Sequence, residues 1–173
     1  MIKEFLELGQ IVGTHGVRGE MRLNPWCDSP EFAAKFKTVY FDEKGTQPVK
    51  VVSCRPHGNV ALIRLTGVNS ANDAEKMRNT VLYIRRGDAH LPHGTWFISE
   101  LIGCEVYDAD DRTHVYGTLC EVMQTGANDV WAVKDNNGRE YLVPAVKSVV
   151  IETDVEQNSV YIRPLKGIFD DAD

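Results

Sequence analysis

The segment that decides the fold is Val130-Trp131-Ala132-Val133-Lys134-Asp135-Asn136-Asn137-Gly138-Arg139-Glu140-Tyr141-Leu142-Val143. It starts and ends with short runs of β-branched and aromatic residues, which are typical of strands. Asn137 and Gly138, between these runs, both tolerate the positive φ angles of tight hairpin turns. The segment therefore predicts a β-hairpin.

The same pattern of short apolar runs between turn residues recurs along the chain. Further strand-like runs lie at residues 49–52, 60–65, 119–123 and 160–162. Only two segments favour helices, and both are short: one is capped by Ser29 before a proline, the other by Ser70. Short strands with few helices are typical of antiparallel barrels and sandwiches. We therefore predict an all-β fold of small barrels with a few short helices.

A stretch with proline and glycine at residues 90–95 is the best candidate for a domain boundary. The net charge changes sign there, because residues 1–92 carry a net charge of +3 and residues 93–173 a net charge of −9. We predict two small β-barrel domains at residues 1–90 and 96–168. A linker at residues 91–95 joins them, and an acidic tail follows at residues 169–173.

The composition is that of an ordinary globular protein, with 173 residues of which 43% are hydrophobic and 25% charged. No apolar run approaches the roughly 20 residues of a membrane span, and the acidic residues near the N-terminus do not suit a signal peptide. We therefore expect a cytoplasmic protein without membrane contact. The cysteines are far apart, which favours reduced thiols over a disulfide framework or a zinc ribbon. They are Cys27, Cys54, Cys104 and Cys120.

Sequence signatures of common enzymes are missing: the chain has no P-loop, no Gly-x-Ser-x-Gly and no His-Glu-x-x-His. The aspartates from Asp108 onward resemble the start of a calcium loop. However, Thr113 stands where that loop needs glycine, and Leu119 stands where it needs glutamate. We expect no catalytic residues, no metal site and no cofactor.

A glycine-rich segment at residues 8–20 predicts a strand that enters a tight, closely packed turn. The turn presents His15, Arg18 and Glu20 beside Gly16 and Gly19. One interpretation makes His15 a general base that Glu20 orients. We favour another, in which the glycines shape a barrel corner and a hydrogen bond between His15 and Glu20 closes the loop. A rigid surface loop for a partner is a third use of the same five residues.

Two adjacent aromatic residues, Trp96 and Phe97, follow the predicted linker. Successive side chains of an extended strand point to opposite sides, so both cannot face the same core. We expect one of them to pack at the seam between the two domains and the other, preferably Trp96, to be available to a partner.

A polar loop at residues 124–129 leads into the strand-like run that begins at Val130. Asn128 and Asp129 offer oxygen ligands for an ion. Turn hydrogen bonds explain the same pair of residues without a ligand, and we favour the turn.

These segments together resemble the RimM family of ribosome maturation factors, also called 16S rRNA processing proteins. Six segments follow the family's pattern in the family's order, which makes the resemblance specific although each segment alone is weak. They are the glycine segment through Glu20, Leu65-Thr66-Gly67-Val68, Glu100-Leu101-Ile102-Gly103-Cys104-Glu105-Val106, Thr125-Gly126-Ala127-Asn128-Asp129-Val130, Tyr141-Leu142-Val143-Pro144 and Leu165-Lys166-Gly167-Ile168.

The resemblance implies an N-terminal translation-factor-type barrel and a C-terminal PRC-type barrel, in agreement with the strand pattern. It also implies a non-enzymatic assembly chaperone. Such a protein binds the free small ribosomal subunit, contacts the nineteenth small-subunit ribosomal protein in the head, and promotes head assembly and 16S rRNA processing. The family's tyrosine-rich pair, implicated in subunit binding, falls here on Trp96 and Phe97. We expect a monomer, with 16S rRNA as a further candidate partner.

Two other functions stay open at this point. An RNA-binding translation-factor-like barrel would need a basic groove, for which the first half of the chain supplies the cations. A small hydrolase built on His15 and Glu20 would need a nucleophile that the sequence does not show. The arginines available for RNA binding are Arg18, Arg22, Arg55, Arg64, Arg78, Arg85 and Arg86.

Overall fold

A computed structural model describes residues 3–88 and 96–169 of the chain. The chain divides into two compact units, Met1–Ser99 and Glu100–Asp173. The predicted linker at residues 91–95 lies outside the described residues, as does all of the predicted tail except Phe169. The boundary between the units therefore falls after Trp96 and Phe97, which the sequence assigned to the C-terminal domain.

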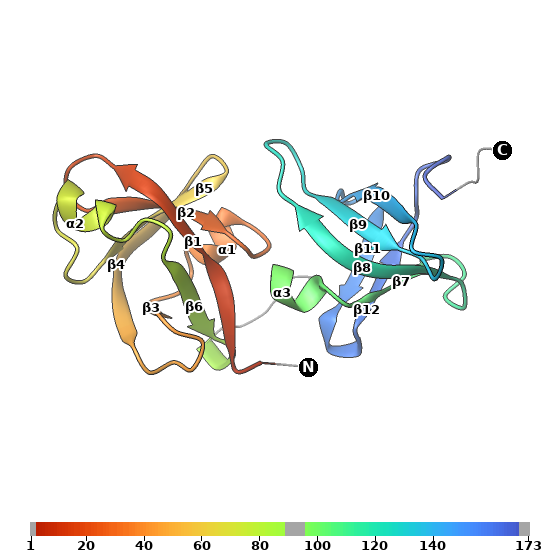
Figure 1. The fold of residues 1–173 in the computed structure, drawn as a ribbon, viewed down its shortest axis with the longest axis horizontal. Coiled ribbons are helices and arrows are strands. Elements are labelled where there is room, and N and C mark those ends of the chain that lie inside the picture. The colour runs from red at the N-terminus through yellow and green to blue at the C-terminus, as the bar shows by residue number, and fades with distance from the viewer. Residues whose placement is uncertain (1–2, 89–95, 170–173) are drawn as a thin grey trace. The chain divides into compact units, whose positions relative to one another are not determined.

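The N-terminal unit is a closed six-stranded barrel with the strand order β1-β2-β5-β4-β3-β6 (Figure 1). All its strand pairs are antiparallel: β1–β2, β3–β4 and β4–β5 are sequential neighbours, while β2 pairs with β5, and β6 closes the barrel between β3 and β1. The strands are β1 (Phe5–His15), β2 (Glu20–Pro25), β3 (Thr38–Tyr40), β4 (Pro48–His57), β5 (Val60–Leu65) and β6 (Val81–Arg85).

Both predicted helices are present and as short as expected. They are α1 (Pro30–Ala33) and α2 (Ala71–Glu75), and a 3₁₀ turn, η1 (Arg86–Asp88), follows β6. The Ser29 hydroxyl accepts a hydrogen bond from the Phe32 amide at 3.1 Å, and the Ser70 hydroxyl accepts one from the Asp73 amide at 3.1 Å. These are N-cap bonds, which satisfy amides that have no partner inside the helix.

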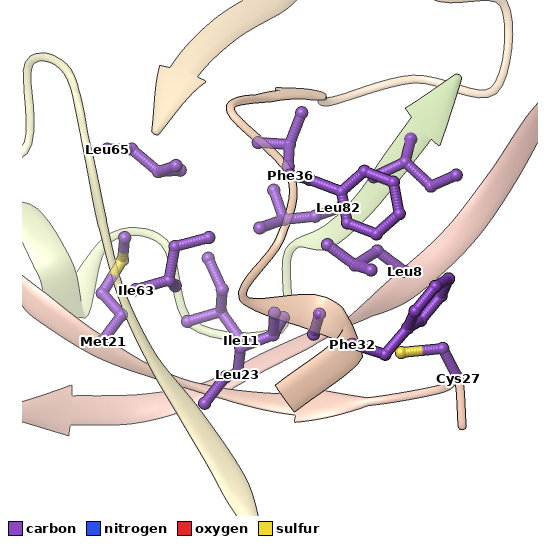
Figure 2. Close-up of a cluster of buried hydrophobic side chains, with 14 of the residues drawn as sticks. Leu8, Ile11, Met21, Leu23, Cys27, Phe32, Phe36, Ile63, Leu65 and Leu82 are labelled. Atoms are coloured by element: carbon purple, nitrogen blue, oxygen red, sulfur yellow. The ribbon is translucent and has the colours of Figure 1, made fainter. Parts of the chain in front are cut away.

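The barrel core follows from the alternation of side chains along each strand. In β2, Met21 and Leu23 are fully buried while Arg22 between them is exposed. Figure 2 shows Met21 and Leu23 grouped with Ile11 and Ile63 inside the barrel. Inward-pointing residues of every strand thus meet in one apolar cluster, as the period of two of a strand requires.

Phe97 joins this N-terminal core. It forms an isolated β-bridge with Cys27, its side chain is 0% exposed, and its ring lies 5.4 Å from that of Phe32. The packed aromatic residue of the pair is therefore Phe97. It packs inside the core of the first unit, so a residue beyond the predicted linker contributes to the N-terminal core.

The C-terminal unit is a six-stranded sheet with the strand order β10-β9-β8-β7-β12-β11 (Figure 1). β12 pairs with β7 in parallel, and the other pairs are antiparallel. Helix α3 (Ile98–Leu101) spans the boundary between the units, and a 3₁₀ turn, η2 (Val155–Gln157), precedes β12. The strands are β7 (Glu105–Asp108), β8 (Val115–Met123), β9 (Val130–Lys134), β10 (Glu140–Pro144), β11 (Val150–Asp154) and β12 (Ser159–Ile162).

The hairpin predicted at residues 130–143 is confirmed, with Tyr141 paired opposite Val133. Its loop is longer than a two-residue turn, because the strands pair only as far as Lys134 and Glu140. Gly138 adopts a φ of 82°, and the Asp135 carboxylate accepts bonds from the amides of residues 137 and 139 at 2.9 and 3.0 Å. The carboxylate of Asp135 thus caps a longer loop, which the Asn-Gly pair alone did not indicate.

All four cysteines are free thiols, as predicted. Cys27 and Cys104 are buried, and burial raises the pKa of the Cys27 thiol to about 12 and that of the Cys104 thiol to about 11. A raised pKa keeps a thiol protonated and unreactive near neutral pH. Among the described residues, no helix has the length and apolar character needed to cross a bilayer.

We predict that Phe97→Ala destabilises the N-terminal unit by about 3–5 kcal/mol, the range for removing a large buried aromatic side chain. The physical reason is a cavity beside Phe32 that the closed barrel cannot fill by collapse. Urea unfolding of the full chain measures the loss. A change below about 1 kcal/mol would contradict the placement of Phe97 in the core.

Candidate functional site

Trp96 lies on a short extended segment that hydrogen-bonds beside residues 26–28. Its carbonyl accepts a bond from the Asp28 amide at 3.0 Å, and the Ile98 amide donates to the Trp26 carbonyl at 2.9 Å. Phe97 points into the core, so Trp96 points to the other side, where it is partly buried. The sequence assigned both aromatics to partner binding. Because Phe97 is buried, only Trp96 can reach a partner while the barrel is folded.

The β1–β2 loop is held by its glycines. Gly16 and Gly19 have φ angles of 69° and 97°, in the left-handed region that favours glycine. A Cβ at Gly19 would lie 2.3 Å from the Val68 carbonyl oxygen, so the loop packs closely against the connection between β5 and α2. At the tip, Val17 is 76% exposed and Arg18 is exposed. The prediction of a rigid loop with accessible side chains agrees with this geometry.

The prediction of a hydrogen bond between His15 and Glu20 is wrong. Glu20 instead forms an ion pair with Arg55 at 3.4 Å, and the His15 ring lies 5.4 Å from the ring of His57. His15 and Glu20 are still neighbours, because they pair across the β1–β2 ladder. Both side chains thus contact residues of β4 and not each other. The geometry therefore gives His15 no carboxylate that would orient it as a general base.

Asn128 and Asp129 form a turn, as the sequence favoured. The Thr125 hydroxyl donates to the Asn128 carbonyl, and the Ala145 amide donates to the Asp129 carbonyl at 2.8 Å. Burial raises the pKa of the Asp129 carboxyl.

The C-terminal unit carries an aromatic cluster that the sequence reasoning missed, formed by Tyr116, Tyr141 and Phe169. The Phe169 ring stacks on that of Tyr116 at 4.3 Å and lies 4.7 Å from that of Tyr141. The three residues line one hollow, together with Leu165, which is 56% exposed. They lie far apart in the sequence, so no local motif could indicate the cluster.

Beside this cluster, the acidic loop after β7 is folded by its own hydrogen bonds. Asp108 accepts bonds from the amides of Asp110 and Asp111 at 2.8 Å each, and its carboxylate also accepts from the Tyr116 hydroxyl. The aspartates thus serve as turn caps, consistent with the rejection of a calcium loop. Within residues 3–88 and 96–169, no group of three His, Cys, Asp or Glu side chains is placed to hold a metal ion.

The Tyr116 hydroxyl is the largest cause that lowers the pKa of Asp108. We therefore predict that Tyr116→Phe moves the pKa of Asp108 upward, toward its ordinary value. A lowered folded-state pKa gives stability that is present above the unfolded-state pKa and is lost as the pH falls through the folded-state pKa. The variant should accordingly lose less stability on acidification.

The shift is measured by NMR titration of the carboxyl carbons. Asp111 is the internal control, because its pKa is lowered mainly by a hydrogen bond from the Thr113 hydroxyl. An unchanged Asp108 pKa, or an equal shift at Asp111, would contradict the assignment.

Both units match known protein domains in chain order. Residues 6–89 match the RimM N-terminal domain, and residues 98–168 match the RimM PRC barrel domain. The chain belongs to the RimM family. The RimM resemblance and the two-domain β-barrel class read from the sequence are thereby confirmed.

Related proteins match the sequence of this chain over nearly its whole length. A protein named ribosome maturation factor RimM from Clostridium botulinum is 38% identical over 166 residues, which cover 95% of this chain and 97% of that protein. A protein of the same name from Acetivibrio thermocellus is 36% identical over 172 residues, covering 97% and 98%.

Among solved structures, a putative 16S ribosomal RNA processing protein RimM from Pseudomonas aeruginosa is similar to this chain. It is 24% identical, with a TM-score of 0.46, over 91% of this chain and 96% of that one.

Proposed function

We propose that this chain is a ribosome maturation factor that binds the free small ribosomal subunit and promotes head assembly and 16S rRNA processing. The observation that carries the proposal is the match of both domains to the RimM family, with relatives named ribosome maturation factor over nearly the full length. The direct partner in the head is the nineteenth small-subunit ribosomal protein, in accordance with the resemblance read from the sequence.

The charge distribution supports a basic protein as the partner of the C-terminal unit. Residues 93–173 carry a net charge of −9. Ribosomal proteins are generally basic, so such a surface attracts them and speeds their encounter. The same charge repels the phosphates of rRNA, which bind where cations neutralise them.

Partly buried aromatic side chains and the exposed Leu165 supply the short-range contacts. The hollow formed by Tyr116, Tyr141 and Phe169 combines flat rings with the polar groups of Asp135 and Lys166. Aromatic anchors in hollows with polar edges are typical of the residues that carry most of a binding free energy. Trp96 is the corresponding anchor in the N-terminal unit.

The mechanism is binding without turnover. By occupying a ribosomal protein and the adjoining rRNA, the factor holds a surface of the head in place until the head has folded. Such an action takes place in the cytoplasm, where the subunits assemble, and is carried out by a monomer without metal or cofactor.

We predict that the full chain co-sediments with purified free small subunits in a sucrose gradient and not with assembled ribosomes. The expected reason is that assembly covers the surface that the factor occupies. Equal binding to free subunits and assembled ribosomes, or binding to neither, would contradict the proposal.

We predict that Trp96→Ala weakens this binding by about 1–3 kcal/mol, an intermediate effect for an aromatic anchor, while the melting temperature stays nearly unchanged. Trp96→Phe is the matched variant and should retain most of the affinity, because a flat apolar ring is kept. Unchanged binding of Trp96→Ala would remove Trp96 from the interface.

A further inference from the structure

Strands β2, β5 and β4 are neighbours in the N-terminal barrel (Figure 1). The outer surface over them is a basic face. Met21 and Leu23 of β2 and Ile63 of β5 point into the core (Figure 2). The residues that alternate with them along these strands therefore point outward. These three strands contain four cationic side chains of Lys and Arg and a single carboxylate, Glu20. The four cations, which define the basic face, are Arg22, Lys50, Arg55 and Arg64.

Two of the arginines flank a leucine on the outer face of the barrel. Leu62 of β5 pairs with Arg22 of β2 on one side and with Arg55 of β4 on the other. Leu62 lies on the outer side of the barrel and yet is 0% exposed, so its neighbours must cover it. Aliphatic stems of long cationic side chains cover apolar surface in this way while their charged ends stay in water. The strand register thus places Arg22, Leu62 and Arg55 side by side on the outer face of three adjacent strands.

These two arginines are available to a ligand. Arg22 is exposed and, within the described part of the chain, forms no ion pair; its guanidinium lies beside Gly13. Arg55 pairs with Glu20, but the Arg55 side chain is 59% exposed. Exposed ion pairs contribute only about 0–1 kcal/mol, so a phosphate can replace Glu20 as the partner of Arg55.

Flat rings lie on the same side of the barrel as Arg55. His57, on β4, is exposed, and its ring is 5.4 Å from that of His15. Imidazole rings beside arginines are the components of sites that bind unpaired nucleotides, where bases stack on rings and cations contact the backbone.

The opposite wall of the barrel carries charges of both signs. β6 is three strands away from β5 in either direction around the barrel. Burial and the carboxylates of Glu7 and Glu43 raise the pKa of Tyr83 on this strand. The hollow beside Tyr83 is lined by Lys3 and Lys44 as well as by these carboxylates, so this wall carries charges of both signs, whereas four cations face a single carboxylate over β2, β5 and β4.

We propose that the basic face binds an unpaired segment of RNA, with Arg22 and Arg55 on its phosphates and His57 against a base. The inference rests on the proposed function, in which the natural source of the segment is 16S rRNA. A basic ribosomal protein does not suit this face, because like charges repel at close contact. The two units then divide the work, the basic one toward RNA and the acidic one toward protein.

The test is fluorescence anisotropy of the full chain with a labelled single-stranded RNA of about 12 nucleotides, at KCl concentrations from about 50 to 200 mM. The double variant Arg22→Gln/Arg55→Gln should bind about 10-fold or more weakly. Its log affinity should depend less steeply on log salt by about 1.4, or about 0.7 for each lost phosphate contact. Glu20→Gln should bind more tightly, because it frees Arg55.

The barrel supplies a matched control pair on its opposite side. Arg85 of β6 pairs with Glu4 at 3.3 Å; these side chains are 53% and 66% exposed, against 59% for Arg55 and 27% for Glu20 in the other pair. Arg85→Gln and Glu4→Gln change the net charge by the same amounts as the single variants Arg55→Gln and Glu20→Gln, and they should leave RNA affinity within about twofold. Equal effects of the two pairs would show that only net charge matters and would overturn the proposal.

Failure of the wild-type chain to bind the RNA at about 50 mM KCl would also overturn it, whatever the outcome of the subunit sedimentation experiment. If the double variant then weakened binding to the isolated nineteenth ribosomal protein, the face would be a protein contact instead. If the wild type bound the RNA but did not co-sediment with free small subunits, the proposed function would be refuted and the RNA site would be supported.

Discussion

The closure of the N-terminal barrel depends on one strand that is hydrogen-bonded on both edges. β1 pairs with β2 along one edge and with β6 along the other, and it bends at bulges next to Gly9 and Gly13. A Cβ at Gly9 would lie 2.2 Å from the carbonyl oxygen of Asn24, so only glycine allows β2 to approach so closely. Bulges raise the local twist and let a sheet curve into a small barrel. The remaining features of this unit, core and surface alike, depend on that closure.

Closure fixes the surface as strictly as the core. Once Met21 and Ile63 point inward, the pleat places Arg22 and Arg64 on the outside, and the register places Arg22 and Arg55 on either side of Leu62. The β1–β2 loop is packed against the Val68 carbonyl by Gly19 in the same way. A binding surface on such a scaffold costs little ordering entropy when a partner arrives, which favours affinity without a conformational change.

The two units carry different means of recognition. The N-terminal barrel gathers cations on one wall, whereas the C-terminal sheet is acidic and offers a cluster of aromatic rings around Phe169. A ribosomal particle presents phosphates and basic proteins side by side. A factor with one surface for each can hold both at once, and two weak contacts on one chain then add to a stronger one.

The sequence by itself determined the class of the fold, because strand periodicity, turn residues and helix caps are local properties. The hairpin of β9 and β10, the Ser29 and Ser70 caps and the turn at Asn128 all follow from neighbours within a few residues. The family, too, was visible in short motifs and their order.

Contacts between distant segments were decided only by the tertiary structure. Phe97 packs against Cys27, and Glu20 pairs with Arg55 and not with its neighbour His15. The cluster of Tyr116, Tyr141 and Phe169 likewise joins three separate segments. Such contacts depend on strand register and barrel closure, which sum interactions over the whole chain, so no single stretch of sequence contains them.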